Sequence, residues 1–202
     1  MKKIISVLAF FIVLGLSAPA WSQAQLSIGI KGGLNFAKLD VNGSVASNYE
    51  SRTGYHAGAF VLFKLTAFAF QPEILFSKQG SQFTANTKSY EANFDYINVP
   101  LMFKFYLPLG LNIQAGPQFG FLTTAEFKET VSGITTDQKD FYKGTDTSAS
   151  MGLGWDLPFG LSVDARYNLG LSKINEGTNN SSTKNKVFQL SAGYKLFKFG
   201  GK

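Results

Sequence analysis

The sequence contains no cysteine, which excludes disulfide bonds, thiolate metal sites and a lipid anchor on an N-terminal cysteine. It has one histidine, so a metal site built from clustered histidines is poorly supported. Lys and Arg number 19 against 13 Asp and Glu, but the lysines are scattered and form no basic stripe. We therefore expect no cofactor, no metal and no nucleic-acid partner.

Long apolar runs are absent beyond the N-terminus, so no later segment resembles a transmembrane helix. The single such run, residues 4–16, follows two lysines and precedes a stretch of small residues. This order is typical of a secretory signal peptide. We predict that residues 1–24 are a signal peptide, cleaved after Ala20 or, as we prefer, after Ala24. Residues 25–202 then form one domain.

Glycine and phenylalanine are abundant, with 21 and 20 residues, and apolar residues recur at every second position. Alternation of this kind is the signature of a β-strand with two different faces. Each alternating segment spans about 10–12 residues, close to the length of a tilted strand that crosses a bilayer. The predicted strands are residues 26–36, 55–65, 67–78, 96–106, 111–121, 148–156, 161–170 and 188–196.

The connections between these segments alternate between long and short. Three are tight, at residues 65–67, 108–110 and 158–160. Four are long and polar, near residues 38–53, 79–93, 123–146 and 172–185. Outer-membrane barrels have short periplasmic turns and longer external loops. The pattern predicts an all-β fold: an eight-stranded, antiparallel, up-and-down transmembrane β-barrel with both termini on the periplasmic side.

The composition of the two strand faces indicates which face is outside. The polar face is rich in Gly, Ser, Asn and Gln, which suit the narrow lumen of an eight-stranded barrel. The apolar face carries aromatic residues near both strand ends, as expected at the two membrane interfaces. These are Phe36, Tyr55, Phe76, Phe121 and Phe188 at one end, and Phe63, Phe68, Phe105, Trp155 and Tyr194 at the other. The alternative is a soluble ligand-binding barrel with its apolar face inward.

Several of these segments also carry recognisable motifs. They are GIKGGLNFA (29–37), FQPEILFSKQG (70–80), YINVPLMFKFY (96–106), NIQAGPQFGFL (112–122), DARYNLGL (164–171) and QLSAGYKLF (189–197). With them the chain resembles the outer-membrane β-barrel domain proteins of Bacteroidetes that are often called PorT-like. The resemblance implies an eight-stranded barrel in the bacterial outer membrane. It implies little about function, and no residue here carries over the secretion role of PorT itself.

Seven charged side chains fall on the predicted inward face. A charge in that confined space is costly unless it is paired and hydrogen-bonded. We expect a structural network of ion pairs that fills the barrel, with Glu73 paired to Lys104 or Arg166; the alternative is a narrow polar conduit. The seven residues are Lys31, Glu73, Lys104, Asp156, Asp164, Arg166 and Lys195.

His56, the only histidine, also falls on the inward face. A membrane-embedded hydrolase would need it beside a nucleophilic serine and an orienting group, and no serine sits in a G-x-S-x-G pattern. We therefore interpret His56 as a polar lumen residue and expect no enzymatic activity. The long loops are where binding specificity could vary at little cost to the fold.

These features favour a non-enzymatic outer-membrane protein with a structural or loop-mediated binding role at the cell envelope. The expected partners are outer-membrane lipid, the barrel-assembly machinery and an envelope or secretion partner bound through the loops. A small porin-like pore or a secretion-associated barrel is the main alternative, although open lumens belong to wider barrels. A membrane-embedded hydrolase has the least support.

Overall fold

A computed structural model describes residues 24–42, 50–85, 88–129, 135–137, 144–172 and 182–200. Residues 1–23 of the predicted signal peptide, and with them the possible cleavage site after Ala20, lie outside the described residues. Its last residue, Ala24, is the first residue of the first strand. Signal-peptide cleavage and the domain start at residue 25 therefore stay predictions.

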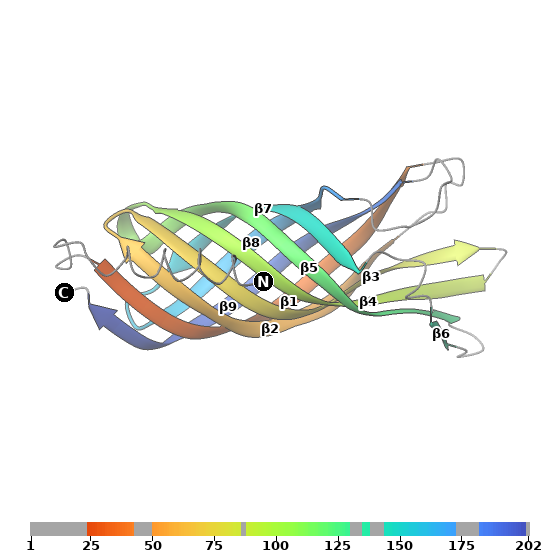
Figure 1. Ribbon diagram of the computed structural model, residues 1–202, viewed down its shortest axis with the longest axis horizontal. Coiled ribbons are helices and arrows are strands. Elements are labelled where there is room, and N and C mark those ends of the chain that lie inside the picture. The colour runs from red at the N-terminus through yellow and green to blue at the C-terminus, as the bar shows by residue number, and fades with distance from the viewer. Residues whose placement is uncertain are drawn as a thin grey trace, which may run out of the picture.

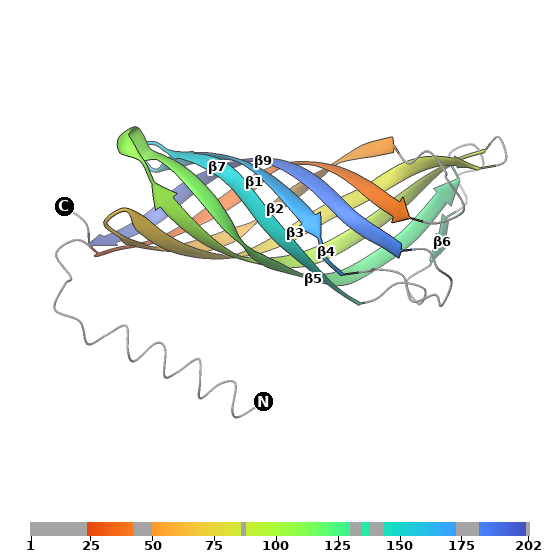
Figure 2. The same ribbon diagram turned by 90° about the horizontal axis from the view of Figure 1, so that it is seen from above.

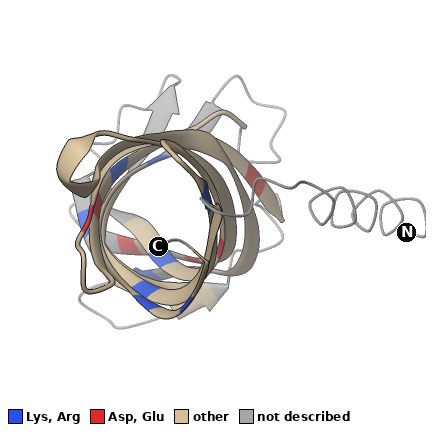
Figure 3. Ribbon diagram, turned by 90° about the vertical axis from the view of Figure 1, so that its left-hand side faces the viewer, with Lys and Arg blue, Asp and Glu red and all other residues tan. Residues whose placement is uncertain are grey.

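Eight long strands form a closed antiparallel barrel (Figure 1), which confirms the predicted fold class. Neighbouring strands in the chain are neighbours in the barrel, and β9 closes the ring against β1. Seen along its axis, the barrel is a continuous ring (Figure 3). The barrel strands are β1 (Ala24–Asn42), β2 (Glu50–Leu65), β3 (Phe68–Ala85), β4 (Lys88–Tyr106), β5 (Leu111–Glu129), β7 (Thr145–Asp156), β8 (Leu161–Gly170) and β9 (Ser182–Gly200).

The three predicted tight connections lie together at one end of the barrel, which we call the turn end (left in Figure 1). The middle one is a 3-10 turn, η1 (Pro108–Gly110), in which Leu109 and Gly110 have φ values of 64° and 81°. The indole of Trp155 donates a hydrogen bond of 3.0 Å to the Leu109 carbonyl and supports this strained turn.

Among the described residues, no helix is long and apolar enough to span a membrane.

At the opposite end, which we call the loop end, most strands are longer than the sequence predicts. The β3–β4 ribbon continues through Gln82 and Glu91, and β5 continues to Glu129, all within predicted loops. A short strand, β6 (Thr135–Asp137), pairs with the end of β5 (Figure 2) and was not predicted. The reason is that backbone pairing continues beyond the apolar band. Outward positions there become polar, so the apolar alternation that marks a strand disappears.

The outer wall carries the predicted apolar residues. Ile113, Met151 and Leu153 in its middle are 51%, 53% and 64% exposed. Aromatic pairs flank this zone: the rings of Phe36 and Phe188 lie 6.2 Å apart toward the loop end. Toward the turn end, the rings of Phe68 and Phe105 lie 5.1 Å apart. This outward apolar zone between two aromatic bands is the arrangement of a membrane barrel.

Glycines on the inner wall make room for large lumen side chains. A Cβ atom at Gly29 would lie 2.5 Å from Cζ of Phe60. A Cβ atom at Gly154 would lie 2.6 Å from Oδ1 of Asn112 and 2.7 Å from Oδ1 of Asp164. Gly154 thus leaves space for lumen side chains, and Gly29 leaves space for both Phe60 and the Tyr194 carbonyl of the neighbouring strand.

A charged residue in the middle of the outer wall tests whether this wall faces lipid. We expect Met151→Arg to lower the free energy of unfolding in phospholipid vesicles by about 2–4 kcal/mol, because the cation must enter hydrocarbon. Thr136→Arg, on exposed β6 at the loop end, is the matched control and should have little effect. Equal effects of the two substitutions in a urea titration would contradict a lipid-facing wall.

Candidate functional site

The lumen brings together the seven predicted charged residues in one charged network. Its cations are Lys31, Lys104, Arg166 and Lys195, and its carboxylates are Glu73, Asp156 and Asp164. Their side chains are at most 9% exposed. They come from β1, β3, β4, β7, β8 and β9, so the network connects opposite walls of the barrel.

Glu73 is at the centre of this network. Its carboxylate accepts two hydrogen bonds from the Arg166 guanidinium, from Nη1 at 2.8 Å and from Nη2 at 2.6 Å. Lys31 Nζ donates to the same carboxylate at 3.1 Å, and Gln71 Nε2 donates at 2.6 Å. Such a bidentate, charge-assisted pair is among the strongest side-chain contacts. Glu73 on β3 thereby holds Arg166 on the opposite strand β8.

Asp164 and Asp156 extend the network toward the turn end. Lys31 Nζ lies 2.7 Å from Asp164 Oδ2, and Lys195 Nζ lies 2.6 Å from Asp156 Oδ2. Lys104 Nζ lies between the two carboxylates, 3.7 Å from Asp164 Oδ1 and 3.9 Å from Asp156 Oδ1. The predicted alternative pairing of Glu73 with Lys104 is therefore wrong. The pairing with Arg166 is present.

Neutral polar groups complete the coordination of the charges. Gln114 accepts from Arg166 Nε at 3.0 Å and donates to Asp164 Oδ1 at 2.7 Å. The Tyr106 hydroxyl donates to Asp156 Oδ2 at 2.8 Å, and Lys64 Nζ lies 3.7 Å above the centre of the Tyr106 ring. The roles of these residues could not be predicted from the sequence, because amides and aromatics on an inward face carry no signal of which charge they contact.

His56 belongs to a second, uncharged lumen cluster. Its Nδ1 donates to Asn35 Oδ1 at 2.8 Å, since an amide oxygen can only accept, and its Nε2 accepts from the Ser191 hydroxyl at 2.9 Å. Gln189 Nε2 donates to the same Asn35 oxygen at 2.8 Å and accepts from Asn168. The geometry fits a neutral histidine within a continuous hydrogen-bond chain.

Apolar residues occupy further inward positions on both sides of the polar clusters. Phe60, Leu62, Ala69 and Tyr106 pack together in the half nearer the turn end. Phe94, Tyr96 and Leu122 are buried at inward positions of β4 and β5 nearer the loop end, with Phe94 0% exposed. The described lumen is therefore occupied by side chains over much of its length, as expected for eight strands.

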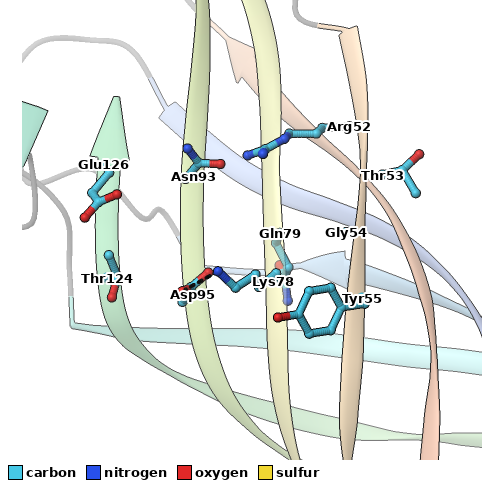
Figure 4. A pocket seen from close by; sticks show the side chains of 10 residues that line it. All are labelled: Arg52, Thr53, Gly54, Tyr55, Lys78, Gln79, Asn93, Asp95, Thr124 and Glu126. Carbon is cyan, nitrogen blue, oxygen red and sulfur yellow. Dashed lines mark ion pairs between the residues drawn. The ribbon is translucent and has the colours of Figure 1, made fainter. Parts of the chain in front are cut away.

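A polar pocket of about 300 Å³ lies at the loop end (Figure 4). Four adjacent strands, β2 to β5, contribute its walls, and Lys78 Nζ points toward Asp95 Oδ2 at 3.5 Å. A second ion pair beside it joins Arg52 Nη2 to Glu91 Oε2 at 3.6 Å. The lining residues are Arg52, Thr53, Gly54, Tyr55, Lys78, Gln79, Asn93, Asp95, Thr124 and Glu126.

Neither polar cluster in the lumen has the features of a metal centre. Within the described part of the chain, no group of three or more His, Cys, Asp and Glu side chains is placed to hold a metal ion. Each carboxylate of the charged network has a cationic partner, and the one histidine contacts only Asn35 and Ser191 in the hydrogen bonds above. The ionised groups of the lumen are thus paired with one another, whereas the buried amides of Asn98 and Asn112 keep atoms without a hydrogen-bond partner.

Comparisons with known proteins agree with this architecture. A family model described as "Outer membrane protein beta-barrel domain" matches residues 21–176. No curated protein matches the sequence. Ail, the attachment invasion locus protein of Yersinia pestis, is 18% identical, with a TM-score of 0.51 over 88% of this chain and 99% of that chain. Neisserial surface protein A is 12% identical, with a TM-score of 0.50 over 85% of this chain and 99% of that chain. At these identities the likeness shows the fold alone.

A second structure of Ail, in complex with the heparin analogue sucrose octasulfate, is similar to the chain to the same degree. It is 16% identical, with a TM-score of 0.50 over 88% of this chain and 99% of that chain.

The role of the charged network is tested by removing its central carboxylate. We expect Glu73→Gln to lower the free energy of unfolding by about 3–5 kcal/mol, because Arg166 and Lys31 lose a shared buried counter-charge. Urea titration in phospholipid vesicles measures this change. The matched control is Glu91→Gln, which breaks the partly exposed pair with Arg52 and should cost about 0–1 kcal/mol. Unchanged stability of Glu73→Gln would contradict a structural network.

Proposed function

Because the chain belongs to the family of outer membrane protein β-barrel domains, we propose that it is a non-enzymatic, non-conducting barrel that supports a binding surface at the cell envelope. Membership of this family supports a location in the bacterial outer membrane. The barrel crosses the bilayer, and its loop-end extensions carry the surface available to other molecules. Specific recognition then depends on the loop end and not on the lumen.

The observation that carries this proposal is the occupied lumen. Arg166 and Glu73 join opposite walls, and both side chains are at most 2% exposed. The charges in the network face each other as ion pairs instead of lining an aqueous path. Water-filled channels belong to barrels of about 16 strands or more. A barrel of eight strands with this filling is suited to anchoring.

The orientation follows from the short connections. Outer-membrane barrels have short turns in the periplasm and longer segments outside. The turn end, with the described ends of β1 and β9, would then face the periplasm, and the β3–β4 ribbon, β5 and β6 would face outward. Export through a cleaved signal peptide at residues 1–24 and insertion by the barrel-assembly machinery fit this orientation.

Two finer assignments rest on resemblance. Membership of the PorT-like proteins of Bacteroidetes is supported by the sequence motifs alone, and with it an envelope or secretion partner bound through the loops. Ail, which shares the fold, has been solved in complex with the heparin analogue sucrose octasulfate, and we propose that charged or sugar-containing ligands contact this chain at its loop end. Both assignments concern partners of the loop end, in agreement with the proposed role.

A membrane-embedded hydrolase is the second candidate, favoured by one observation. Ser191, His56 and Asn35 form the chain of hydrogen bonds that links a nucleophile, a base and an orienting group in hydrolases. However, His56 is 2% exposed and Ser191 8%, and the Asn35 oxygen is shared with Gln189. We therefore assign this chain of hydrogen bonds to lumen packing.

Planar-bilayer recording separates anchoring from conduction. The full-length protein, refolded and shown by its heat-dependent migration in detergent gels to be a folded barrel, should give no steady single-channel steps. The reason is that ion pairs and apolar side chains fill the lumen. A porin of about 16 strands, reconstituted in parallel, is the positive control. Uniform steps from the folded protein would overturn the proposal in favour of a pore.

A further inference from the structure

The polar pocket at the loop end begins where the apolar wall ends. Pairing across β3, β4 and β5 aligns Phe76, Ile97 and Phe121 in one row. The next row toward the loop end is Lys78, Asp95 and Thr124. The outer wall therefore changes from apolar to charged and polar between two successive rows of outward-facing residues. Two residues of a strand advance about 7 Å, which places this row directly beyond the aromatic band.

The pocket opens on the outer surface, and of its β3 lining residues Lys78 is on the outward face and Gln79 on the inward face. Lys78 alternates with Ser77 and Gln79, which are 0% and 7% exposed on the inward face. The Lys78 side chain is 46% exposed, and the Tyr55 residue is 50% exposed. In an outer membrane whose outer leaflet meets the loop end, this surface lies at the level of the lipid headgroups.

The charges of the pocket favour a neutral polar ligand over a simple anion. Arg52 and Lys78 are balanced by Asp95 and Glu126 within the lining, and Glu91 adds a further carboxylate beside it. A free phosphate ion would be repelled by these carboxylates, which lowers its affinity for the pocket. Asn93 and Thr124 supply additional donors and acceptors suited to hydroxyl groups.

Tyr55 supplies the apolar face that a sugar ring requires. Its ring is 6.4 Å from the Phe76 ring, which belongs to the aromatic band. The phenol therefore extends from the apolar wall into the polar pocket, presenting a ring face together with a hydroxyl. A pocket of about 300 Å³ is at the small end of ligand sites, which suits one or two sugar rings.

Most of the pocket wall is preformed, because β3, β4 and β5 are paired along it. Residues 52–55 of β2 pair with β1 and lie at an irregularity in the β2–β3 register. Gly54 lies where β2 and β3 approach closely, since a Cβ atom there would collide with the Lys78 carbonyl. This close contact brings the β2 residues Arg52 and Tyr55 beside Asp95 of β4. A wall that is mostly preformed lowers the ordering cost of binding.

We propose that this pocket binds a sugar unit in the headgroup of an outer-leaflet glycolipid. The inference rests on the proposed function, because it requires the loop end to face outward from the outer membrane. The acyl chains of the same lipid would lie along the apolar wall below Phe76 and Ile97, while the sugar occupies the pocket. The pocket would thus fix one glycolipid against the β2–β5 wall.

The test measures binding of purified lipopolysaccharide to the full-length folded protein in detergent. Asp95→Ala combined with Asn93→Ala should weaken binding at least tenfold, because both remove side chains that hydrogen-bond to hydroxyl groups. Lys128→Gln is the matched control at the loop end, since Lys128 does not line the pocket; it should stay within twofold. Both variants should keep the heat-dependent gel migration of the wild type. Equal binding by wild type and the double variant would overturn the proposal.

Two further arms identify the ligand chemistry. Dephosphorylated lipopolysaccharide should bind within about threefold of the intact form, and loss of binding would show an anion site instead. The deacylated oligosaccharide should bind at least tenfold more weakly, and equal affinity would show a free-saccharide site. A chain that is extracted without detergent would contradict the proposed function itself. A folded membrane barrel that does not bind lipopolysaccharide would contradict only the pocket.

Discussion

Ionised side chains inside an eight-stranded barrel must be paired across the lumen, and this constraint shapes the rest of the molecule. Glu73 meets this requirement for Arg166 and Lys31 at once, with contacts of 2.6–3.1 Å. Because the partners stand on different strands, satisfying each charge also fixes the positions of opposite walls. The small residues of the inner wall follow from the same constraint: Gly154 leaves the space that Asn112 and Asp164 occupy.

The two faces of each strand have separate roles. The inward face pairs its charged groups with one another and fills much of the barrel, so it stabilises the fold without offering a path for ions. The outward face is apolar along the bilayer and becomes charged from Lys78 and Asp95 onward. Recognition is therefore expected where the outward face extends beyond the hydrocarbon of the bilayer. The packed inward face keeps this part of the barrel rigid.

The sequence predicted the strand number, the tight turns and the inward position of Lys31 and Arg166, because period-two alternation is a local property. It could not predict partners: Glu73 meets Arg166 rather than Lys104, which depends on the tilt of strands far apart in the chain. The strand ends were missed because outward polar residues such as Asn93 resemble a loop. A register shift between Asp95 and Tyr96 also changes the alternation there, and the pocket lies beside it.

The most direct test of the central claim is a double-mutant cycle on Glu73 and Arg166, with free energies of unfolding measured in phospholipid vesicles. The single variants Glu73→Gln and Arg166→Gln each leave a buried charge without its main partner, whereas the double variant removes both charges. We predict a coupling energy of about 1–3 kcal/mol, with the double variant more stable than the sum of the single effects requires. Additive effects, within about 0.5 kcal/mol, would contradict a lumen held together by this ion pair.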